Sequence, residues 1–553
     1  MTHDTWGNST AELGGVAAAK APFRSLLSGF ACSAARFPSR TAVNAGGECR
    51  SYAELAQAVS DIAATIGAHA SKPGPLAALM AERSHTTYAG SLGILASGRG
   101  YVPLNPKFPA ERLKKILRAS GTDVVVVGRE CAGALEALLP SIDTPLLLIL
   151  PDIADAARLG TAFPHHRFLG PEALLRGPEI PAAPQVEPRA IAYLLFTSGS
   201  TGEPKGVAVT HANVQAYLRE AVAAYAISEE DRISQHFDLS FDLSVHDMFL
   251  CWERGACLYP LAGKALMHPV KFIRDNKLTM WFSVPSAAGY MWKMNMLRPG
   301  CLPSLRYSLF CGEPLPAAYA EAWQAAAPNS VVDNLYGPTE ATIAFARYRW
   351  KPEESPEACA NGIVPIGRVF NGQAACIIGP DRRVLGTGES GELCLSGSQV
   401  TPGYWNNPEK TREQFVNLER TEGVWYRTGD VARQDADGCL YYLGRLDNQV
   451  KIRGYRVELQ EVDWVLRQAS GTGDATAVAW PLRDGAATGV VGFIGGLPNL
   501  NREAVLAYCR ERLPYYMVPA KLYELPSIPL NVNGKIDRSA LIRILEADEQ
   551  WQS

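Results

Sequence analysis

The sequence lacks the features that mark several broad classes of protein. No apolar run approaches the roughly 20 residues needed to cross a bilayer, and segments such as 124–127 and 146–150 are far too short. The N-terminus has no basic segment ahead of an apolar one, so it does not predict a secretory signal. The net charge of −3 gives no reason to expect nucleic acid. We therefore expect a cytoplasmic protein that binds neither membranes nor nucleic acid.

The cysteines do not predict a metal site or a disulfide framework. The twelve cysteines form no Cys-x-x-Cys pair, and neither Cys251 with Cys257 nor Cys301 with Cys311 has a neighbouring histidine pair to complete a zinc site. Internal repeats and low-complexity tracts are also lacking. We expect reduced, mostly buried thiols.

The length and the order of the expected elements predict an α/β protein of unequal parts. At 553 residues, 47% of them hydrophobic, the chain exceeds one ordinary core. From Phe23 to Gly199 helices and strands alternate, which predicts parallel strands sandwiched by helices. The expected elements there and just beyond are helix 110–119, strands 123–127, 146–150, 191–196 and 207–209, and helix 211–225 with Thr210 as its N-cap.

A smaller α+β part is expected after Arg445. It comprises one basic strand from Val450 to Val457, then helix 461–468, strands 475–480 and 490–494, and helix 503–513. The predicted division is a flexible arm at 1–24, a large part at 25–445 and a small part at 446–553, with a hinge near Asp447.

The loop after strand 191–196 has a composition suited to phosphate. The stretch TSGSTGEPKG, residues 197–206, interleaves glycines with hydroxyls and adds the positive charge of Lys205. Glycines let a backbone approach a ligand closely and expose its N–H groups. The spacing differs from the Gly-x4-Gly-Lys-Ser/Thr loop of nucleotide triphosphatases. Composition alone predicts either a polyphosphate loop or a flexible surface turn.

The wording of this loop resembles the phosphate-binding signature of the adenylate-forming superfamily. That superfamily includes acyl-CoA synthetases, luciferases and the adenylation domains of nonribosomal peptide synthetases. Seven further stretches resemble the same superfamily in order: SYAEL (51–55), GYVPLNP (100–106), NLYGPTE (334–340), GEL (391–393), YRTGD (426–430), GRLD (444–447) and NGK (533–535). The resemblance covers nearly the whole chain. It implies a large N-terminal domain of parallel sheets sandwiched by helices and a small mobile α+β C-terminal domain.

By this resemblance the catalytic groups act on the phosphates of ATP. Thr339 touches the α-phosphate and Glu340 holds Mg²⁺. Lys535 bridges the substrate carboxylate and the phosphate. Lys205 is the fourth residue of this catalytic set. Cations and donors are needed because two anions must meet and a pentavalent centre develops. Without the resemblance, Glu340 is a turn carboxylate and Lys535 is a surface lysine.

The nucleoside of ATP is assigned to other motifs by the same resemblance. Tyr336 stacks on adenine and Asn334 hydrogen-bonds its amino group, while Asp430 accepts the ribose hydroxyls with Arg445 nearby. Without the resemblance, Tyr336 is a core aromatic residue and Asp430 and Arg445 are solvated. The resemblance further implies as ATP-binding Thr197, Ser198, Gly199, Ser200, Thr201, Gly202, Gly312, Glu313, Pro314, Gly337 and Tyr442.

An acidic residue in an apolar stretch indicates that the substrate is an amino acid. In amino-acid-activating members the Asp of the motif FDLSV, residues 241–245, pairs with the substrate ammonium group, and Asp242 is similar to it. A buried carboxylate is costly unless it meets a cation, and Asp242 lies in an apolar, strand-like stretch. Asp238 repeats the wording four residues earlier, but Val245 and Met248 complete the pattern only for Asp242. The alternative is a structural capping residue.

The remaining substrate pocket is expected to be small and apolar. By resemblance it is lined by Asp242, Leu243, His246, Phe282, Leu309, Cys311, Leu335, Ile343, Ala344 and Lys535. Bulky Phe282, Leu309 and Leu335 leave little room, and His246 is expected to pack at the pocket edge. The wording LFCGE at 309–313 resembles free-standing D-alanine–carrier-protein ligases, and the pocket also resembles free-standing proline-activating enzymes. Both imply a small neutral amino acid.

These features predict an adenylating ligase that uses ATP and Mg²⁺ and loads a separate carrier protein. No Gly-Gly-His-Ser-type motif follows Lys535, so we expect the phosphopantetheine thiol to come from a discrete partner. Gly454 is expected to line the pantetheine channel. An acyl- or aryl-CoA ligase and a catalytically silent adapter that binds a carrier remain the alternatives. The sequence leaves open which amino acid, which stereochemistry and which carrier are used.

Overall fold

The computed structural model describes the chain at residues 23–71, 74–179, 185–198, 203–419, 421–447, 449–483, 486–497, 500–530 and 536–548. Nearly all of the predicted N-terminal arm lies outside these residues. Five predicted site residues also lie outside them: Gly199, Ser200, Thr201, Gly202 and Lys535.

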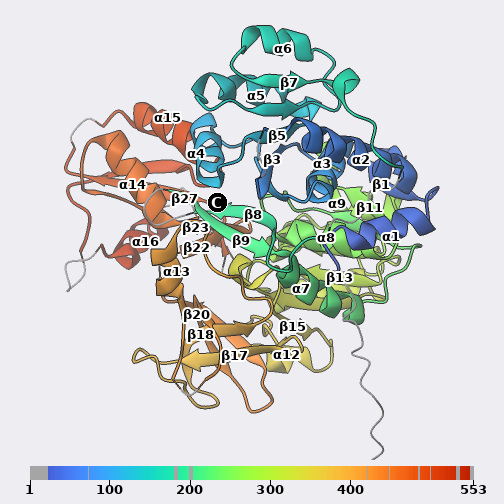
Figure 1. The fold of residues 1–553 in the computed structure, drawn as a ribbon. Coiled ribbons are helices and arrows are strands. Elements are labelled where there is room, and N and C mark those ends of the chain that lie inside the picture. Colours follow the sequence, from blue (N-terminus) through green and yellow to red (C-terminus); the bar gives the residue numbers. More distant parts are fainter. Residues whose placement is uncertain are drawn as a thin grey trace, which may run out of the picture.

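A large, mostly parallel sheet carries the glycine-rich loop (Figure 1). Its strand order is β7 (Arg167–Leu169), β6 (Leu147–Ile149), β5 (Val124–Val127), β3 (Leu76–Met80), β4 (Gly100–Pro103), β8 (Ile191–Thr197) and β9 (Lys205–Thr210). The pairs from β7 to β8 are parallel, and β9 returns antiparallel to β8. All four residues of β5 are valine and all are buried, as expected of a strand covered on both faces.

A second large sheet, with nine strands among the described residues, is also mostly parallel. Its strand order is β16 (Arg368–Val369), β15 (Ala346–Arg349), β14 (Val331–Tyr336), β13 (Tyr307–Phe310), β12 (Met280–Ser283), β10 (Arg232–Gln235), β11 (Cys257–Pro260), β1 (Thr41–Ala45) and β2 (Glu48–Ser51). The pairs from β14 to β1 are parallel. The predicted α/β architecture is confirmed.

Buried helices fill the space between the sheets. In α3 (His85–Ala96) every residue from Thr86 to Leu95 is buried, as expected of a helix with protein on all sides. It packs on α2 (Tyr52–His69), which begins with a capping box of Ser51 and Glu54. The other helices of this part are α1 (Ser28–Arg36), α4 (Ala110–Ser120), α5 (Ala132–Leu138), α6 (Ala156–Ala162), α7 (His211–Ala224), α8 (Leu243–Glu253), α9 (Pro269–Asp275), α10 (Pro285–Lys293), α11 (Ala317–Ala326), α12 (Ser355–Ala358) and α13 (Pro408–Gln414).

An antiparallel sheet ends the large part of the chain. It contains β17 (Gln373–Ile378), β18 (Ser390–Gly397), β20 (Trp425–Gln434) and β19 (Phe415–Val416), and β21 (Leu440–Arg445) pairs with β20. The predicted hinge residue Asp447 comes two residues after the end of β21, and the next strand, β22 (Gln449–Ile452), belongs to a different sheet.

The C-terminal unit is a small α+β structure beyond that segment. Its sheets are β23 (Tyr455–Glu458), β22 (Gln449–Ile452), β26 (Ala486–Ala487) and β25 (Leu482–Arg483), and separately β24 (Ala475–Ala479), β27 (Val490–Gly495) and β28 (Lys521–Leu525). Its helices are α14 (Leu459–Ser470), α15 (Arg502–Arg512) and α16 (Arg538–Glu546). Figure 1 shows α14 and α15 beside α4 of the large part, where Arg112 forms a buried ion pair with Glu461.

Two local predictions are wrong. The expected single strand from Val450 to Val457 is a hairpin, because Arg453 (φ 50°) and Gly454 (φ 83°) form a two-residue turn between β22 and β23. Positive φ at both positions is the geometry that favours a tight hairpin, and glycine supplies it without strain. The strand-like stretch around Asp242 is instead the start of α8, with Asp242 at the N-cap position. Its apolar run is buried on all sides, and such a run does not distinguish strand from helix.

Candidate functional site

The predicted residues converge on a cavity at the carboxyl ends of parallel strands. Ligands of α/β sheets bind at this end, where loops leave the sheet. The predicted residues that line it are Thr197, Ser198, Asp242, Leu243, Cys311, Gly312, Tyr336, Gly337, Thr339, Asp430, Arg445 and Gly454. Its free volume of ≈ 110 Å³ is well below the roughly 300–1,000 Å³ of pockets that hold whole ligands. As described, the cavity is therefore too small for ATP.

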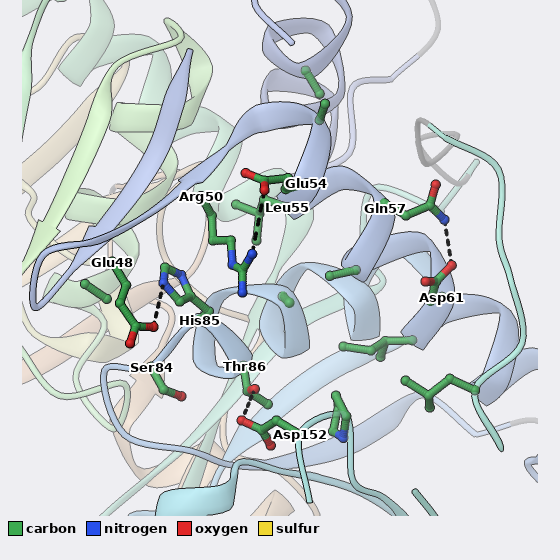
Figure 2. Close-up of a pocket in the computed structure, with 18 of the residues that line it drawn as sticks. Glu48, Arg50, Glu54, Leu55, Gln57, Asp61, Ser84, His85, Thr86 and Asp152 are labelled. Atoms are coloured by element: carbon green, nitrogen blue, oxygen red, sulfur yellow. Dashed lines mark hydrogen bonds and ion pairs between the residues drawn. The ribbon is translucent and has the colours of Figure 1, made fainter. Parts of the chain in front are cut away.

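A larger cleft lies elsewhere and contains none of the predicted site residues. Figure 2 shows this cleft of ≈ 1290 Å³ between α2 and the start of α3. Charges of both signs line it, and some already meet each other, such as Arg50 with Glu54 and Arg176 with Asp61. Its size alone gives no chemical role.

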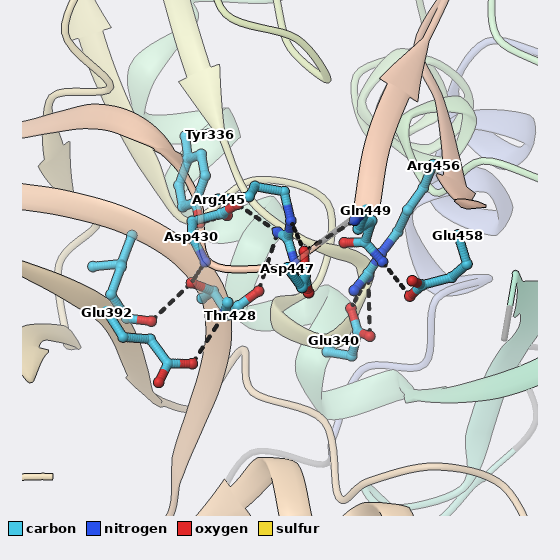
Figure 3. A network of polar contacts seen from close by, with 12 residues as sticks. Tyr336, Glu340, Glu392, Thr428, Asp430, Arg445, Asp447, Gln449, Arg456 and Glu458 are labelled. Atoms are coloured by element: carbon cyan, nitrogen blue, oxygen red, sulfur yellow. Dashed lines mark hydrogen bonds and ion pairs between the residues drawn. The ribbon is translucent and has the colours of Figure 1, made fainter. Parts of the chain in front are cut away.

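The side of the cavity that is predicted to bind the nucleoside is a connected polar network (Figure 3). Asp430 accepts hydrogen bonds from the Tyr336 hydroxyl and from Arg445. Arg445 also donates from Nε and Nη2 to Asp447, at 2.7 Å each. These contacts hold the Tyr336 ring at the cavity wall and tie it to the segment of the predicted hinge.

Asn334 lies two residues before Tyr336 on β14 and outside the cavity lining. Its Nδ2 donates to the carbonyl of Pro365 at 2.9 Å. Its buried Oδ1 atom has no partner among the described residues. An acceptor that is free in the interior suits a donor that arrives with a ligand.

Glu340 lies behind the part of the cavity that is predicted to bind phosphate, and it is fully buried. Arg456 Nη1 donates to both of its oxygens, at 2.8 and 3.0 Å, and the Tyr404 hydroxyl donates at 2.9 Å. Burial by itself raises the pKa of Glu340, but the charges of Arg456 and Lys205 outweigh it and hold the pKa at about 2. Burial next to Arg456 lowers the pKa of Lys205 to about 8.

Asp242 projects a carboxylate into the cavity from the start of α8. Only 6% of it is exposed, and Oδ2 accepts a hydrogen bond from the Ile343 N–H at 2.9 Å. Burial raises its pKa to about 6. No cationic side chain pairs with it among the described residues. In the part of the chain that the structure describes, the carboxylate therefore has no counterion, which a buried charge requires.

Six other predicted pocket residues pack behind the cavity wall rather than lining it. The ring centroids of Phe282 and His246 are 4.8 Å apart. His246 Nδ1 is hydrogen-bonded to the Tyr217 hydroxyl at 2.6 Å. Burial lowers the pKa of His246 to about 3, so it is neutral near pH 7. The residues buried with these two are Leu309, Leu335, Ile343 and Ala344.

Other predicted residues lie apart from the lining. Glu313 Oε2 accepts from the Ser286 N–H at 2.8 Å, a local contact at the start of α10. Pro314 and Tyr442 also do not line the cavity. In the described part of the chain no cluster of three His, Cys, Asp or Glu side chains could hold a metal ion.

The β22–β23 hairpin of the C-terminal unit closes the cavity. Ser198 of the glycine-rich loop donates to the Arg456 carbonyl at 3.0 Å and accepts from the Glu458 N–H at 3.1 Å. Gly454 lies so close to the large part that an added Cβ would be 2.6 Å from Val284. Lys451 and Arg456 line the cavity as well. Sequence analysis missed both, although the alternation of basic residues in KIRGYR was a signal for them.

A second cavity adjoins the first across this hairpin. It has a volume of ≈ 240 Å³ and shares Phe241, Gly454 and Tyr455 with the first. Its lining carries charges of both signs, and Lys107 is ion-paired there with Glu82. The two cavities therefore lie on either side of Gly454 and Tyr455.

Comparison with known proteins identifies relatives of this chain. A model of the family described as "AMP-binding enzyme" matches residues 30–405. Tyrocidine synthase 2 of Brevibacillus parabrevis is 32% identical over 92% of this chain. The chain spans 13% of that relative's length.

Solved structures agree in fold. The Vibrio cholerae adenylation domain AlmE in complex with glycyl-adenosine-5'-phosphate is 31% identical with a TM-score of 0.86, covering 97% of this chain and 100% of that one. Holo-PA1221, with adenylation and PCP domains, is 25% identical with a TM-score of 0.77, covering 95% of this chain and 85% of that one. No helix in the described residues combines the length and apolarity of a membrane span.

Proposed function

This chain belongs to the AMP-binding enzyme family, and from that premise we propose that it activates a small neutral amino acid and loads it onto a carrier protein. In the first step a carboxylate oxygen of the amino acid attacks the α-phosphorus of ATP. The bond to the β-phosphate breaks, and pyrophosphate leaves. In the second step a phosphopantetheine thiol loses its proton and attacks the acyl carbon, and AMP leaves.

The observation that carries this proposal is the buried Asp242 carboxylate without a cationic partner among the described residues. The ammonium group of an amino acid supplies the missing charge at the cavity surface. A fatty or aromatic acid has no such group and leaves Asp242 uncompensated. The apolar residues behind the wall, Phe282 and Leu335 among them, favour a small side chain. AlmE, a relative, is described with glycyl-adenosine-5'-phosphate, which supports this substrate class.

We assign the nucleotide of the adenylate to the polar network. Tyr336 offers its ring to adenine, Asn334 Oδ1 offers a free acceptor to the amino group, and Asp430 accepts from the ribose. Thr339 lines the cavity, and we assign the α-phosphate to it. Lys535 and the glycine-rich loop residues 199–202 retain the roles that the sequence predicts for them.

The first step requires another orientation of the C-terminal unit. With the hairpin inserted, the cavity cannot hold ATP, and Arg456 takes the Glu340 oxygens. Glu340 in this arrangement does not fit Mg²⁺, so no step is routed through a metal here. The inserted hairpin instead suits the second step, because the adjoining cavity gives a thiol arm a route past Gly454. A rotation near Asp447 exchanges the two arrangements.

The test is a pyrophosphate-exchange panel followed by carrier loading. The panel includes proteinogenic, D- and β-amino acids together with fatty and benzoic acids, and loading uses discrete phosphopantetheinylated carrier proteins. We expect exchange with one or a few small neutral amino acids. Exchange driven by fatty or benzoic acids would support the acyl- or aryl-CoA ligase alternative. Exchange with none of these acids would support the silent adapter.

A further inference from the structure

Two cysteines of the antiparallel sheet lie directly opposite each other. Cys376 is on β17 and Cys394 is on β18, and the two strands pair in register at these residues (Figure 1). Both side chains belong to one small apolar cluster with Ile378, Leu418 and Trp425, in which Cys376 is 8% exposed and Cys394 is 0% exposed. Both thiols are free, and the proposed reaction uses neither of them.

The geometry of this pair suits a disulfide. Opposite residues of an antiparallel ladder have Cα atoms roughly 4.5–5.5 Å apart, and disulfides join Cα atoms that are roughly 4.4–6.8 Å apart. A hydrogen bond between the two thiols lowers the pKa of Cys376 and raises the pKa of Cys394. Because the thiolate is the reactive form, Cys376, on the last strand of the sheet, is the residue placed to react first.

We propose that Cys376 and Cys394 are an oxidation site, at which hydrogen peroxide forms a reversible cross-strand disulfide that weakens nucleotide binding. The Cys376 thiolate attacks one peroxide oxygen, the O–O bond breaks, and the departing hydroxide takes up the Cys376 proton as water, leaving a sulfenic acid. The Cys394 thiol then attacks the Cys376 sulfur. An S–S bond forms, and the sulfenic hydroxyl leaves with the Cys394 proton as a second water. Two thiols are oxidised, and one peroxide is reduced.

The strand that carries Cys394 also holds the stretch that leads to Asp430. The Leu393 carbonyl accepts from the Thr428 hydroxyl at 2.8 Å, and that hydroxyl accepts from the Asp430 N–H at 3.0 Å. Cβ atoms of opposite residues are roughly 4.5–5.5 Å apart, whereas a disulfide needs about 3.8 Å. The disulfide therefore draws Cys394 toward β17 and pulls the neighbouring Leu393 carbonyl away from Thr428 on β20.

Loss of that contact displaces Asp430, which weakens the hold on the nucleotide. This consequence rests on the proposed function, because it uses the assignment of the ribose to Asp430. The same mismatch strains the disulfide, and strained disulfides are the readily reduced ones. The modification is therefore reversible by a thiol reductant.

The test treats the purified protein with hydrogen peroxide and maps its disulfides by mass spectrometry of unreduced peptides. The background is Cys32→Ser with Cys49→Ser, because these two thiols are exposed and would react independently of the pair. We expect one peptide pair linked through Cys376 and Cys394, and recovery of both thiols with dithiothreitol. Calorimetric titration of the oxidised protein with AMP should show affinity weaker by about fivefold, at the low end of couplings between distinct sites.

Separate Cys376→Ala and Cys394→Ala variants should each lose the linked peptide and the effect of peroxide on AMP affinity. Cys376→Ser is the second choice if alanine impairs folding, and the map of the background protein needs neither. The absence of the linked peptide, or a linked form with the AMP affinity of the reduced protein, would overturn the inference. Failure of the reduced protein to bind AMP would contradict the proposed function and the coupling, while the peptide map decides separately whether the disulfide forms.

Discussion

Replacing Asp242 by Asn tests whether the buried carboxylate recognises the substrate ammonium. The amide has nearly the same shape, and its oxygen can still accept from the Ile343 N–H, which now lies 2.9 Å from Oδ2. The substitution therefore removes the charge and leaves the local hydrogen bond in place. Alanine would also open a cavity, which would mix a packing effect with the electrostatic one.

The expected loss follows from the burial and the pKa of this group. With 6% of the residue exposed, an ammonium in the site would be left without its counterion at a cost of about 3–5 kcal/mol. The pKa of about 6 means that the carboxylate is still mostly ionised at pH 7 in the wild type. Amino-acid-dependent exchange should fall by at least about a hundredfold.

The assay is ATP–pyrophosphate exchange with the cognate amino acid, paired with calorimetric titration of AMP to show that nucleotide binding persists. Asp238→Asn is the matched comparison, because the Asp238 carboxylate bonds within its own turn to Ser240. It should have a much smaller effect. Unchanged kcat and KM in Asp242→Asn would refute the assignment of this carboxylate to the ammonium.

Stability adds a second readout with a definite sign. Because the folded-state pKa of Asp242 is raised from 3.8 to about 6, the native protein holds a proton that the unfolded chain releases. Stability from this group is therefore lost as pH rises from about 4 to about 6, by about 3 kcal/mol at most. Asp242→Asn should raise Tm relative to wild type at pH 8 and change it less at pH 4. The opposite trend would mean that the group is stabilised as a carboxylate by the protein itself.

Three further predictions concern the two orientations and the pocket. Gly454→Ala should slow carrier loading and spare exchange, since the φ of Gly454 is +83° and an added Cβ would clash with Val284. The control Gly473→Ala has open space around it and should alter neither rate. Equal losses in both assays for Gly454→Ala would contradict the rotation. Arg112→Met leaves the buried Glu461 without its partner, so it should destabilise the described orientation by about 3–5 kcal/mol and slow carrier loading while exchange stays intact. Adding Glu461→Met should restore loading. No recovery in the double variant would show that this pair does not set the orientation. Phe282→Ala should open space behind the cavity wall and admit a larger apolar amino acid in the exchange panel, shifting preference by roughly 1–3 kcal/mol. An unchanged profile would mean that packing behind the wall does not limit substrate size.

Local patterns in the sequence predicted most of the large part of the fold. Strands such as Ile191–Thr197 and Val124–Val127 are apolar runs ended by turn residues, and their burial follows from that pattern. Thr210 caps α7 by accepting from the Asn213 N–H, as its residue type predicts. These features depend on neighbours within a few positions, which a single sequence displays directly.

Predictions failed where a local pattern fitted two structures. The stretch around Asp242 is apolar enough for a buried strand or a buried helix. In the folded protein it forms the start of the buried helix α8. The alternation in KIRGYRV continued across a turn, so that one strand was predicted where Arg453 and Gly454 form the tip of a hairpin. Gly454 within the alternating stretch was the signal that could have indicated the turn.

The sequence by itself determined which chemical groups the protein has: the glycine-rich loop, the acid in an apolar run and the ordered motifs of one enzyme family. The tertiary structure alone decided how these groups pair. Arg456 and Glu340 are 116 residues apart, and nothing local to either one indicates their contact. Asp242, Tyr336 and Gly454 likewise meet at one cavity only because parallel strands end at the same edge and the C-terminal hairpin folds over it. Long-range pairing depends on how whole elements pack, and this is the information that local residue patterns do not contain.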